Sequence, residues 1–251
     1  MQNLLKTKDG SFSLYSEKYK DFYHSTKDGA ILETLYKHII PAFSINAEST
    51  LDYASTLPQN PIKILDICFG LGYNALFSLA FARRLGISVE IHSVELNLLQ
   101  SLRTFAYPKI LQFYLPLDEI LEGVFSCGAW HSGNLALFLH KGDAKDYLET
   151  LVEQSRIFDI IYQDAFSPTK NAELWSEEHF CKLFSLLHSK GVVSTYSSSK
   201  KVREICRKCG FEVYSMQSGN LKNGSIFCKN LNEQAKSLSF ESITLTHLLK
   251  T

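Results

Sequence analysis

The sequence lacks any apolar stretch long enough to cross a bilayer. Its longest nearly apolar run, residues 75–82, contains a serine. A membrane-spanning helix needs roughly 20 such residues. The first residues, MQNLLKTKDGSF, also lack the apolar segment of a signal peptide. We therefore expect a cytoplasmic protein without a membrane partner.

An excess of charge of either sign is also missing, because 26 lysines and arginines balance 26 aspartates and glutamates. This balance excludes a globally basic nucleic-acid-binding protein but allows a local basic patch. Two groups of basic residues are candidates for such a patch: Lys200, Lys201, Arg203, Arg207 and Lys208, and nearer the start Lys6, Lys8, Lys18, Lys20 and Lys27. A run of charges is usually only a solvated face, so the patch is a hypothesis.

The usual cysteine pattern of a zinc site is absent. The six cysteines are residues 68, 127, 181, 206, 209 and 228, and only Cys206 and Cys209 form a CxxC pair. A structural zinc site needs a second pair at similar spacing. We therefore expect no metal, and in a reducing cytoplasm we expect all six cysteines to be free thiols.

The first part of the chain is expected to be an extension before the main domain. Residues 11–25 are rich in Tyr, Phe and Ser and predict a short hairpin. Residues 31–43 carry apolar side chains at helical spacing and predict an amphipathic helix. The PQNP segment at 58–61 is a natural boundary. We expect an extension at 1–58, a core domain at 59–231 and a tail at 232–251.

From Ile62 onwards, short apolar strands alternate with helical segments. Strands are expected at 62–68, 88–96, 135–143, 158–164 and 191–197, and helices at 74–85, from 97 to about 122, and at 144–154, 176–189 and 199–209. Two further strands, 211–218 and 224–230, form a hairpin, so the last strand is expected to be antiparallel. The alternation predicts a Rossmann-like α/β fold with helices on both faces of a mostly parallel sheet.

Four acidic residues, Asp66, Glu95, Asp143 and Asp164, stand at the ends of predicted strands. Ligands of such folds bind outside the carboxyl ends of the strands, near the point where the strand order reverses. We therefore expect these acids to converge on one edge of the sheet and to mark a binding site there.

The first strand runs into a glycine-containing turn, ILDICFGLGYN, that includes Phe69, Gly70, Gly72 and Asn74. Glycines at such a turn allow the backbone to approach a ligand closely. A phosphate-binding fingerprint would have a third glycine where this chain has Ala75, a change that some fingerprints tolerate. An ordinary tight turn is the alternative interpretation.

The acids favour a cationic nucleoside as the ligand. Glu95 suits a ribose diol, Asp143 with Ala144 suits an adenine amine, and Asp66 faces a positive group. Carboxylates at these places repel the phosphates of a dinucleotide but attract the sulfonium and ammonium groups of S-adenosylmethionine. The charge argument therefore favours S-adenosylmethionine over NAD.

At this point the sequence resembles a known family, the methyltransferase domain of the bacterial tRNA-modifying enzyme MnmC, also found alone as the DUF752 proteins. The segment DAFSPTKNAELW, residues 164–175, is similar to the family pattern Asp-Gly/Ala-Phe-Ala/Ser-Pro-x-Lys-Asn-Pro-x-x-Trp. Residues 20–34 and 191–213 are similar to two further family segments. No oxidase domain accompanies them, so the stand-alone form is expected. The sequence departs from the family pattern at three positions. Ala172 replaces the usual proline, Asp66 stands where glutamate is common, and Tyr73 interrupts the glycine-rich motif.

The resemblance implies methylation of the 5-aminomethyl group on the tRNA wobble uridine, giving 5-methylaminomethyl(-2-thio)uridine, downstream of an MnmE/MnmG-type pathway. Asp164 and Phe166 are then the catalytic residues. Asp164 could orient the amine, take its proton or stabilise the cation formed on transfer. Phe166 and Pro168 would wall a pocket and stack on a flipped-out uracil. The implied substrate-binding set is Glu33, Pro168, Lys170, Lys200, Lys201 and Arg203. Glu33 is placed near the amino end of the cofactor by family analogy, although a helix-surface acid is an equal alternative.

Two other functions remain open at this stage. An aminopropyltransferase-like enzyme acting on a small amine would also place an acid and a proline after the fourth strand. The Phe-Ser-Pro-x-Lys-Asn wording and the basic clusters argue for an anionic substrate instead. The second alternative is a non-catalytic module that binds S-adenosylmethionine or tRNA, against which the intact Asp164 argues.

Overall fold

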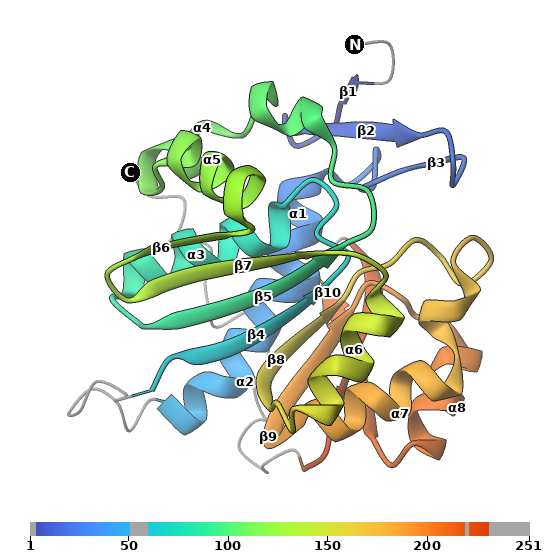
Figure 1. The fold of residues 1–251 in the computed structure, drawn as a ribbon. Helices are drawn as coiled ribbons and strands as arrows, with labels where there is room; N and C mark the ends of the chain where they lie inside the picture. Colours follow the sequence, from blue (N-terminus) through green and yellow to red (C-terminus); the bar gives the residue numbers. More distant parts are fainter. Residues whose placement is uncertain (1–3, 51–59, 219–220, 231–251) are drawn as a thin grey trace.

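The computed structural model describes residues 4–50, 60–218 and 221–230. Within these ranges the chain forms the predicted α/β fold, with a large, mostly parallel sheet and a small antiparallel sheet near the N-terminus (Figure 1). The predicted tail at 232–251 and part of the predicted boundary at 58–61 lie outside the described residues. The division into three segments therefore stays a prediction.

The large sheet has its strands in the order β10–β11–β9–β8–β4–β5–β7–β6. The five central strands β4, β5, β7, β8 and β9 are parallel. At the edges, β6 pairs antiparallel with β7, β11 with β9, and β10 with β11. The strands are β4 Ile62–Ile67, β5 Val89–Glu95, β6 Ala129–Ser132, β7 Leu135–Lys141, β8 Phe158–Gln163, β9 Leu187–Thr195, β10 Glu212–Ser218 and β11 Leu221–Cys228. The chain builds outward from β4 on one side and then returns to β8 on its other side. This reversal is the topological switch point of the sheet.

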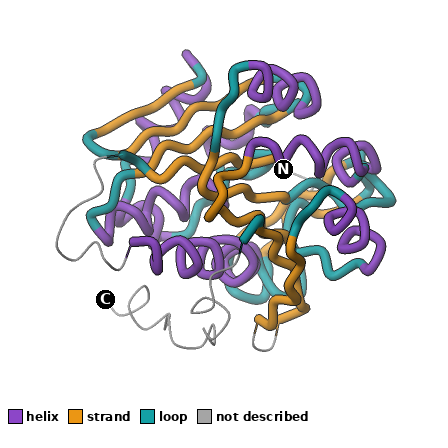
Figure 2. The backbone as a smooth tube through the Cα atoms, turned by 90° about the horizontal axis from the view of Figure 1, so that it is seen from below, coloured by secondary structure: helices purple, strands orange, loops and turns teal. Residues whose placement is uncertain are grey.

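Helices cover both faces of the sheet, as Figure 2 shows from below. Successive strand residues point to opposite faces, so Ile64 of β4 joins one buried cluster and Leu65 the other. The first cluster includes apolar residues of α3 Tyr73–Leu85 and α5 Leu117–Cys127, and the second those of α6 Ala144–Glu153, α7 Glu177–Leu186 and α8 Lys200–Lys208. Two shorter helices, η3 Gln100–Thr104 and α4 Lys109–Tyr114, precede α5, and η4 Ala172–Trp175 precedes α7. No helix in the described part of the chain is long and apolar enough to span a membrane.

Most predicted strands and helices of the core are confirmed within a few residues. The segment predicted as helical from 97 to about 122 is instead divided into η3, α4 and α5, and α5 ends at Cys127. There are two exceptions elsewhere. The strand β6 was not predicted, because AWHS is short and half of it is exposed. It forms a hairpin with β7 across residues 133–134. The other exception is the end of α7, predicted at 189 but observed at Leu186, where β9 begins directly. Leu187 pairs with Phe158 of β8, and this tertiary contact overrides the local helical pattern.

The N-terminal extension forms the predicted hairpin and helix, each with an addition. β2 Phe12–Ser16 and β3 Asp21–Phe22 are antiparallel, and β1 Leu4–Lys6 adds a third strand. The predicted helix begins as α1 Ala30–Thr34, continues through a π-helical turn, η1 Leu35–Ile39, and ends as α2 Ile40–Thr50. Single π-turns within α-helices are frequent at functional sites.

The extension is tied together by Asp9. Its carboxylate accepts hydrogen bonds from the Ser11 backbone and hydroxyl at 3.0 and 2.6 Å, the Thr7 hydroxyl at 2.9 Å, and the Leu32 N–H at 2.9 Å. Gly29 has φ +100°, and a Cβ there would lie 2.0 Å from the Asp9 carboxyl carbon. Only glycine allows the carboxylate to reach the start of α1.

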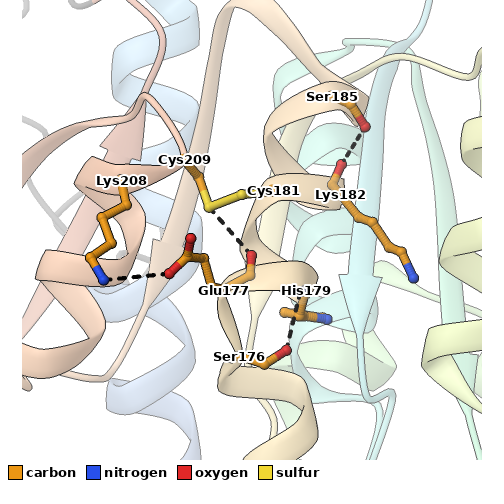
Figure 3. Close-up of a disulfide and its surroundings, with 8 residues drawn as sticks. All are labelled: Ser176, Glu177, His179, Cys181, Lys182, Ser185, Lys208 and Cys209. Atoms are coloured by element: carbon orange, nitrogen blue, oxygen red, sulfur yellow. Dashed lines mark hydrogen bonds and ion pairs between the residues drawn. A yellow bond between two sulfur atoms is a disulfide. The ribbon is translucent and has the colours of Figure 1, made fainter.

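The prediction of six free thiols is wrong for Cys181 and Cys209, which form a disulfide between α7 and the residue after α8 (Figure 3). Their Cα atoms are 5.0 Å apart, within the usual range for a disulfide. Cys206, the other member of the CxxC pair, is a buried core residue. The sequence separation of 28 residues gave no sign of this pairing, because only the packing of α7 against α8 brings the two cysteines together.

Candidate active site

A cavity of about 660 Å³ lies at the carboxyl ends of the central strands, beside the switch point. It is lined by residues that follow β4, β5, β7 and β8 and by residues of the N-terminal extension. The lining contains nine of the residues proposed from the sequence: Glu33, Phe69, Gly70, Asn74, Glu95, Asp143, Ala144, Asp164 and Phe166. The other seven lie outside the lining: Asp66, Gly72, Pro168, Lys170, Lys200, Lys201 and Arg203.

Two backbone N–H groups hold the Glu95 carboxylate, one from the turn after β4 and one from the residues that follow β5. Cys68, Gly70 and Gly72 all have positive φ, at 71°, 55° and 78°. The Gly70 N–H donates to one Glu95 carboxylate oxygen at 2.9 Å, and the Asn97 N–H donates to the other at 2.8 Å. Each oxygen keeps a lone pair for a further donor. Cys68 is strained there because it is not glycine, and it lines the cavity.

Asp66 and Gly72 have roles beneath the cavity and not in its wall. Asp66 is fully buried and accepts a hydrogen bond from the Ser93 hydroxyl at 2.8 Å. Burial, together with the nearby charges of Asp164 and Glu95, raises the pKa of Asp66 to about 7. A Cβ on Gly72 would lie 2.7 Å from the Phe69 ring, so Gly72 lets that ring pack over the turn. The expectation that Asp66 faces a ligand directly has no support in this geometry.

Asp164, the first residue after β8, is held through both carboxylate oxygens and keeps only 12% of its side chain exposed. The Asn74 side-chain amide donates to Oδ2 at 2.8 Å, and the Thr34 hydroxyl in turn donates to the Asn74 oxygen at 3.1 Å. His38 Nε2 lies 3.4 Å from Oδ1. Burial raises the pKa of Asp164, but His38, His24 and the Asn74 hydrogen bond outweigh it and hold the pKa below its ordinary value of 3.8.

A second histidine–carboxylate pair lies in the extension. His24 is buried, and its Nδ1 is 3.4 Å from Oε2 of Glu33, which also accepts the Ser25 N–H at 2.9 Å. Burial lowers the pKa of His24, but Glu33 outweighs it, so the pKa is raised. Glu33 lines the cavity and is therefore more than a surface acid of a helix.

Phe166 packs against two aromatic residues of the extension. Its ring stacks on Tyr19 with centroids 4.3 Å apart, and Tyr23 meets it edge to face at 5.1 Å. Lys18 Nζ lies 4.9 Å from the centroid of the Tyr19 ring. One face of Phe166 is therefore already covered by protein.

Two other residues of the 164–175 segment, Trp175 and Lys170, make structural contacts. The Trp175 indole N–H donates to the Phe166 carbonyl at 2.7 Å, and its ring is buried in the core. Lys170 Nζ donates to Asp21 at 2.7 Å and to the Lys20 carbonyl at 2.9 Å, which ties the segment to the N-terminal hairpin. These contacts explain why the segment has a lysine at position 170 and a tryptophan at position 175.

The predicted basic residues of α8 have different environments. Lys200 and Lys201 are exposed. Arg203 donates to the hydroxyls of Ser225 and Ser215 and to the Gly224 carbonyl, so it anchors α8 to the β10–β11 hairpin. It is engaged within the protein and does not line the cavity.

The main site residues missed from the sequence are His24, His38, Tyr19 and Tyr23. The two tyrosines stood in the predicted hairpin, where their spacing gave no sign that they pack on Phe166. His38 is fully buried on the inner face of the predicted helix. The position of His38 on a mostly apolar helix face was the one feature of the sequence that could have indicated its role in the site.

The chain is similar to several known proteins. A family model described as S-adenosyl-L-methionine-dependent methyltransferase matches residues 117–228. An uncharacterized protein of Methanocaldococcus jannaschii is 26% identical over 233 residues, covering 91% of this chain and 60% of that protein. The tRNA 5-methylaminomethyl-2-thiouridine biosynthesis bifunctional protein MnmC of Azoarcus is 31% identical over 219 residues, covering 79% of this chain and 31% of MnmC. The crystal structure of MnmC2 from Aquifex aeolicus matches with a TM-score of 0.77 and 27% identity, covering 99% of this chain and 84% of that one.

The fold and the family match over residues 117–228 define the class of protein that this chain resembles, the S-adenosyl-L-methionine-dependent methyltransferases. Within that class the chain is MnmC-like. It is similar to MnmC over 31% of the length of that protein and to MnmC2 over 84% of its length.

Proposed function

We propose that this protein methylates the 5-aminomethyl group of the tRNA wobble uridine, giving 5-methylaminomethyl(-2-thio)uridine. The proposal is supported by the similarity to MnmC and MnmC2. The structural observation that carries it is the Asp164 carboxyl group, held at the wall of the cavity by Asn74 and His38. The same similarity supports a cytoplasmic enzyme that acts after an MnmE/MnmG-type pathway has installed the aminomethyl group.

The cavity suits a cationic nucleoside. Its volume of about 660 Å³ is in the usual range for small-molecule sites. Carboxylates dominate its charged lining: Asp21, Asp28, Glu33, Glu95, Asp143, Asp164 and Glu173, against Lys18 and Lys37. Glu95 has lone pairs for a ribose diol, and Gly70 brings the backbone close to it. S-adenosyl-L-methionine would bind here and supply an electrophilic methyl group.

Asp164 orients the acceptor amine. An alkylammonium has a pKa of about 10, whereas the pKa of Asp164 lies below 3.8, so the proton transfer between them is strongly unfavourable. The ammonium therefore loses its proton to a base in the solvent before the amine enters the site, and the neutral fraction of the amine is the nucleophile. Asp164 accepts a hydrogen bond from one of the remaining N–H groups of the amine. Its negative charge stabilises the positive charge that develops on the nitrogen during methyl transfer.

Tyr19 and Phe166 form the aromatic wall against which a flipped-out uracil is placed in this proposal, whereas Pro168 does not line the cavity. The exposed lysines Lys18, Lys200 and Lys201 are the candidates for contacts with the tRNA backbone. Binding through them is expected to weaken steeply as the salt concentration rises.

The function is tested by methyl transfer from radiolabelled S-adenosyl-L-methionine to tRNA that carries unmethylated 5-aminomethyluridine. We expect label in 5-methylaminomethyluridine after nucleoside analysis. Transfer to putrescine or another small amine, with unlabelled tRNA, would replace the proposal by the small-amine function. Binding of the methyl donor without any transfer would make the protein a binding module.

Replacing Glu95 with alanine is expected to weaken S-adenosyl-L-methionine binding by about 1–3 kcal/mol, the cost of losing charge-assisted hydrogen bonds. The change also removes the acceptor that fixes the Gly70 N–H. Isothermal titration calorimetry measures the affinity, with the exposed Glu119→Ala of α5 as the matched control. An unchanged dissociation constant for Glu95→Ala would place the ribose elsewhere.

A further inference from the structure

His38 is a buried imidazole that faces the catalytic carboxylate from a π-helical turn. Its side chain is fully inaccessible to solvent. Nδ1 lies 3.0 Å from the Ser194 hydroxyl of β9. Nε2 makes no hydrogen bond of normal geometry within the described residues, and it lies 3.4 Å from Oδ1 of Asp164. Buried polar nitrogens are rarely left without a partner, so this one needs an explanation.

The two oxygens of Asp164 are held by different elements. Asn74 of α3 binds Oδ2, and His38 of η1 faces Oδ1. The chain of contacts Ser194–His38–Asp164 therefore fixes the rotation of the carboxylate, while Thr34 fixes Asn74. Neither oxygen can turn away from the cavity without breaking a buried contact.

We propose that His38 positions Asp164 for the acceptor amine by holding its Oδ1 while Asn74 holds Oδ2. His38 itself is buried and does not line the cavity, so it acts through Asp164. This inference deepens the proposed function and rests on it for the identity of the amine. The pairing of His38 with Asp164 is decided independently of the substrate.

Several charged or titratable groups lie near His38 and Asp164 and contribute to the electrostatic potential at these two side chains. The Tyr162 ring of β8 meets the His38 ring edge to face at 5.4 Å, and burial raises the pKa of that phenol, which keeps it neutral. Lys37 is the neighbour of His38 on the same turn and is itself buried. Asp66 acts on Asp164 with a like charge, and His24 acts on it with an opposite one.

The decisive experiment compares the wild type with His38→Gln and Ser194→Ala, using His131→Gln of the exposed β6 edge as the matched control. We expect kcat for tRNA methylation to fall roughly 10- to 100-fold in His38→Gln, because a misplaced catalytic group costs that much. The KM for tRNA and the dissociation constant for S-adenosyl-L-methionine should stay within about threefold, since His38 touches neither ligand. Ser194→Ala should show a smaller fall in kcat in the same direction.

The second readout is the titration of the Asp164 carboxyl by ¹³C NMR, with the resonance assigned from the Asp164→Asn spectrum. Because His38 lowers the pKa of Asp164, its replacement by glutamine should move the titration to higher pH. An unchanged titration, or a kcat equal to that of His131→Gln, overturns the inference. A loss of thermal stability with normal kcat would show a structural role only and overturns it as well.

Failure of the proposed function is recognised separately. If the wild type methylates no tRNA, the proposed function fails, while the NMR titrations of His38→Gln and Ser194→Ala still decide whether His38 controls Asp164. If His38→Gln does not fold, Ser194→Ala decides, because it leaves the imidazole in place and removes only its Nδ1 partner.

Discussion

Asp164→Asn is expected to lower kcat for methyl transfer roughly 100- to 1000-fold, the usual cost of removing one preorganised electrostatic group from an active site. Asparagine keeps the shape of the side chain but removes the charge that stabilises the nitrogen as it takes the methyl group. Single-turnover transfer of radiolabelled methyl groups measures the chemical step directly.

The affinity for S-adenosyl-L-methionine should change only a few-fold in Asp164→Asn. Glu95 and Gly70, which the proposal assigns to the methyl donor, are untouched by the change. Asp118→Asn, an exposed acid of α5, serves as the control and should behave as the wild type. Turnover of Asp164→Asn within twofold of that control would remove Asp164 from the catalytic role.

Reduction of the Cys181–Cys209 disulfide is expected to lower the free energy of unfolding by about 3 kcal/mol. The bond closes a loop of 28 residues, which limits the conformations open to the unfolded chain. Urea denaturation with and without dithiothreitol measures the difference. Thiol titration of the oxidised, denatured protein should find two fewer thiols than in the reduced protein.

A matched pair of variants isolates this effect. Cys181→Ser should unfold at the same urea concentration with and without reductant, because it has no bond to lose. Cys127→Ser removes an exposed free thiol and should keep the full response to reductant. Equal stability of the wild type in both conditions would mean that the disulfide contributes nothing.

The order of the core elements could be predicted because strands and helices follow different periodicities. The apolar run IKILDIC is typical of a buried strand, and the amphipathic pattern of α6 is typical of a helix with one buried face. The end of α7 could not be predicted, because it depends on the pairing of Leu187 with Phe158, far away in sequence. The disulfide was missed for the same reason.

Part of the site followed from one rule, that side chains after parallel strands meet at the same edge. This rule placed Glu95, Asp143 and Asp164 correctly in one cavity wall. It failed for Asp66, which lies within β4 and whose side chain is fully buried. It was silent on His38 and Tyr19, because these come from the extension, and no pattern in the sequence says where an extension docks.

The contact between His38 and Ser194 spans 156 residues, and this separation sets when the site can form during synthesis. At about 5–20 residues per second, the ribosome needs roughly 8–30 s to add that stretch. The N-terminal extension therefore leaves the ribosome well before β9, its docking partner, exists. A nascent chain cannot form the His38–Ser194 contact until β9 is made, so the proposed positioning of Asp164 by His38 arises only late in synthesis.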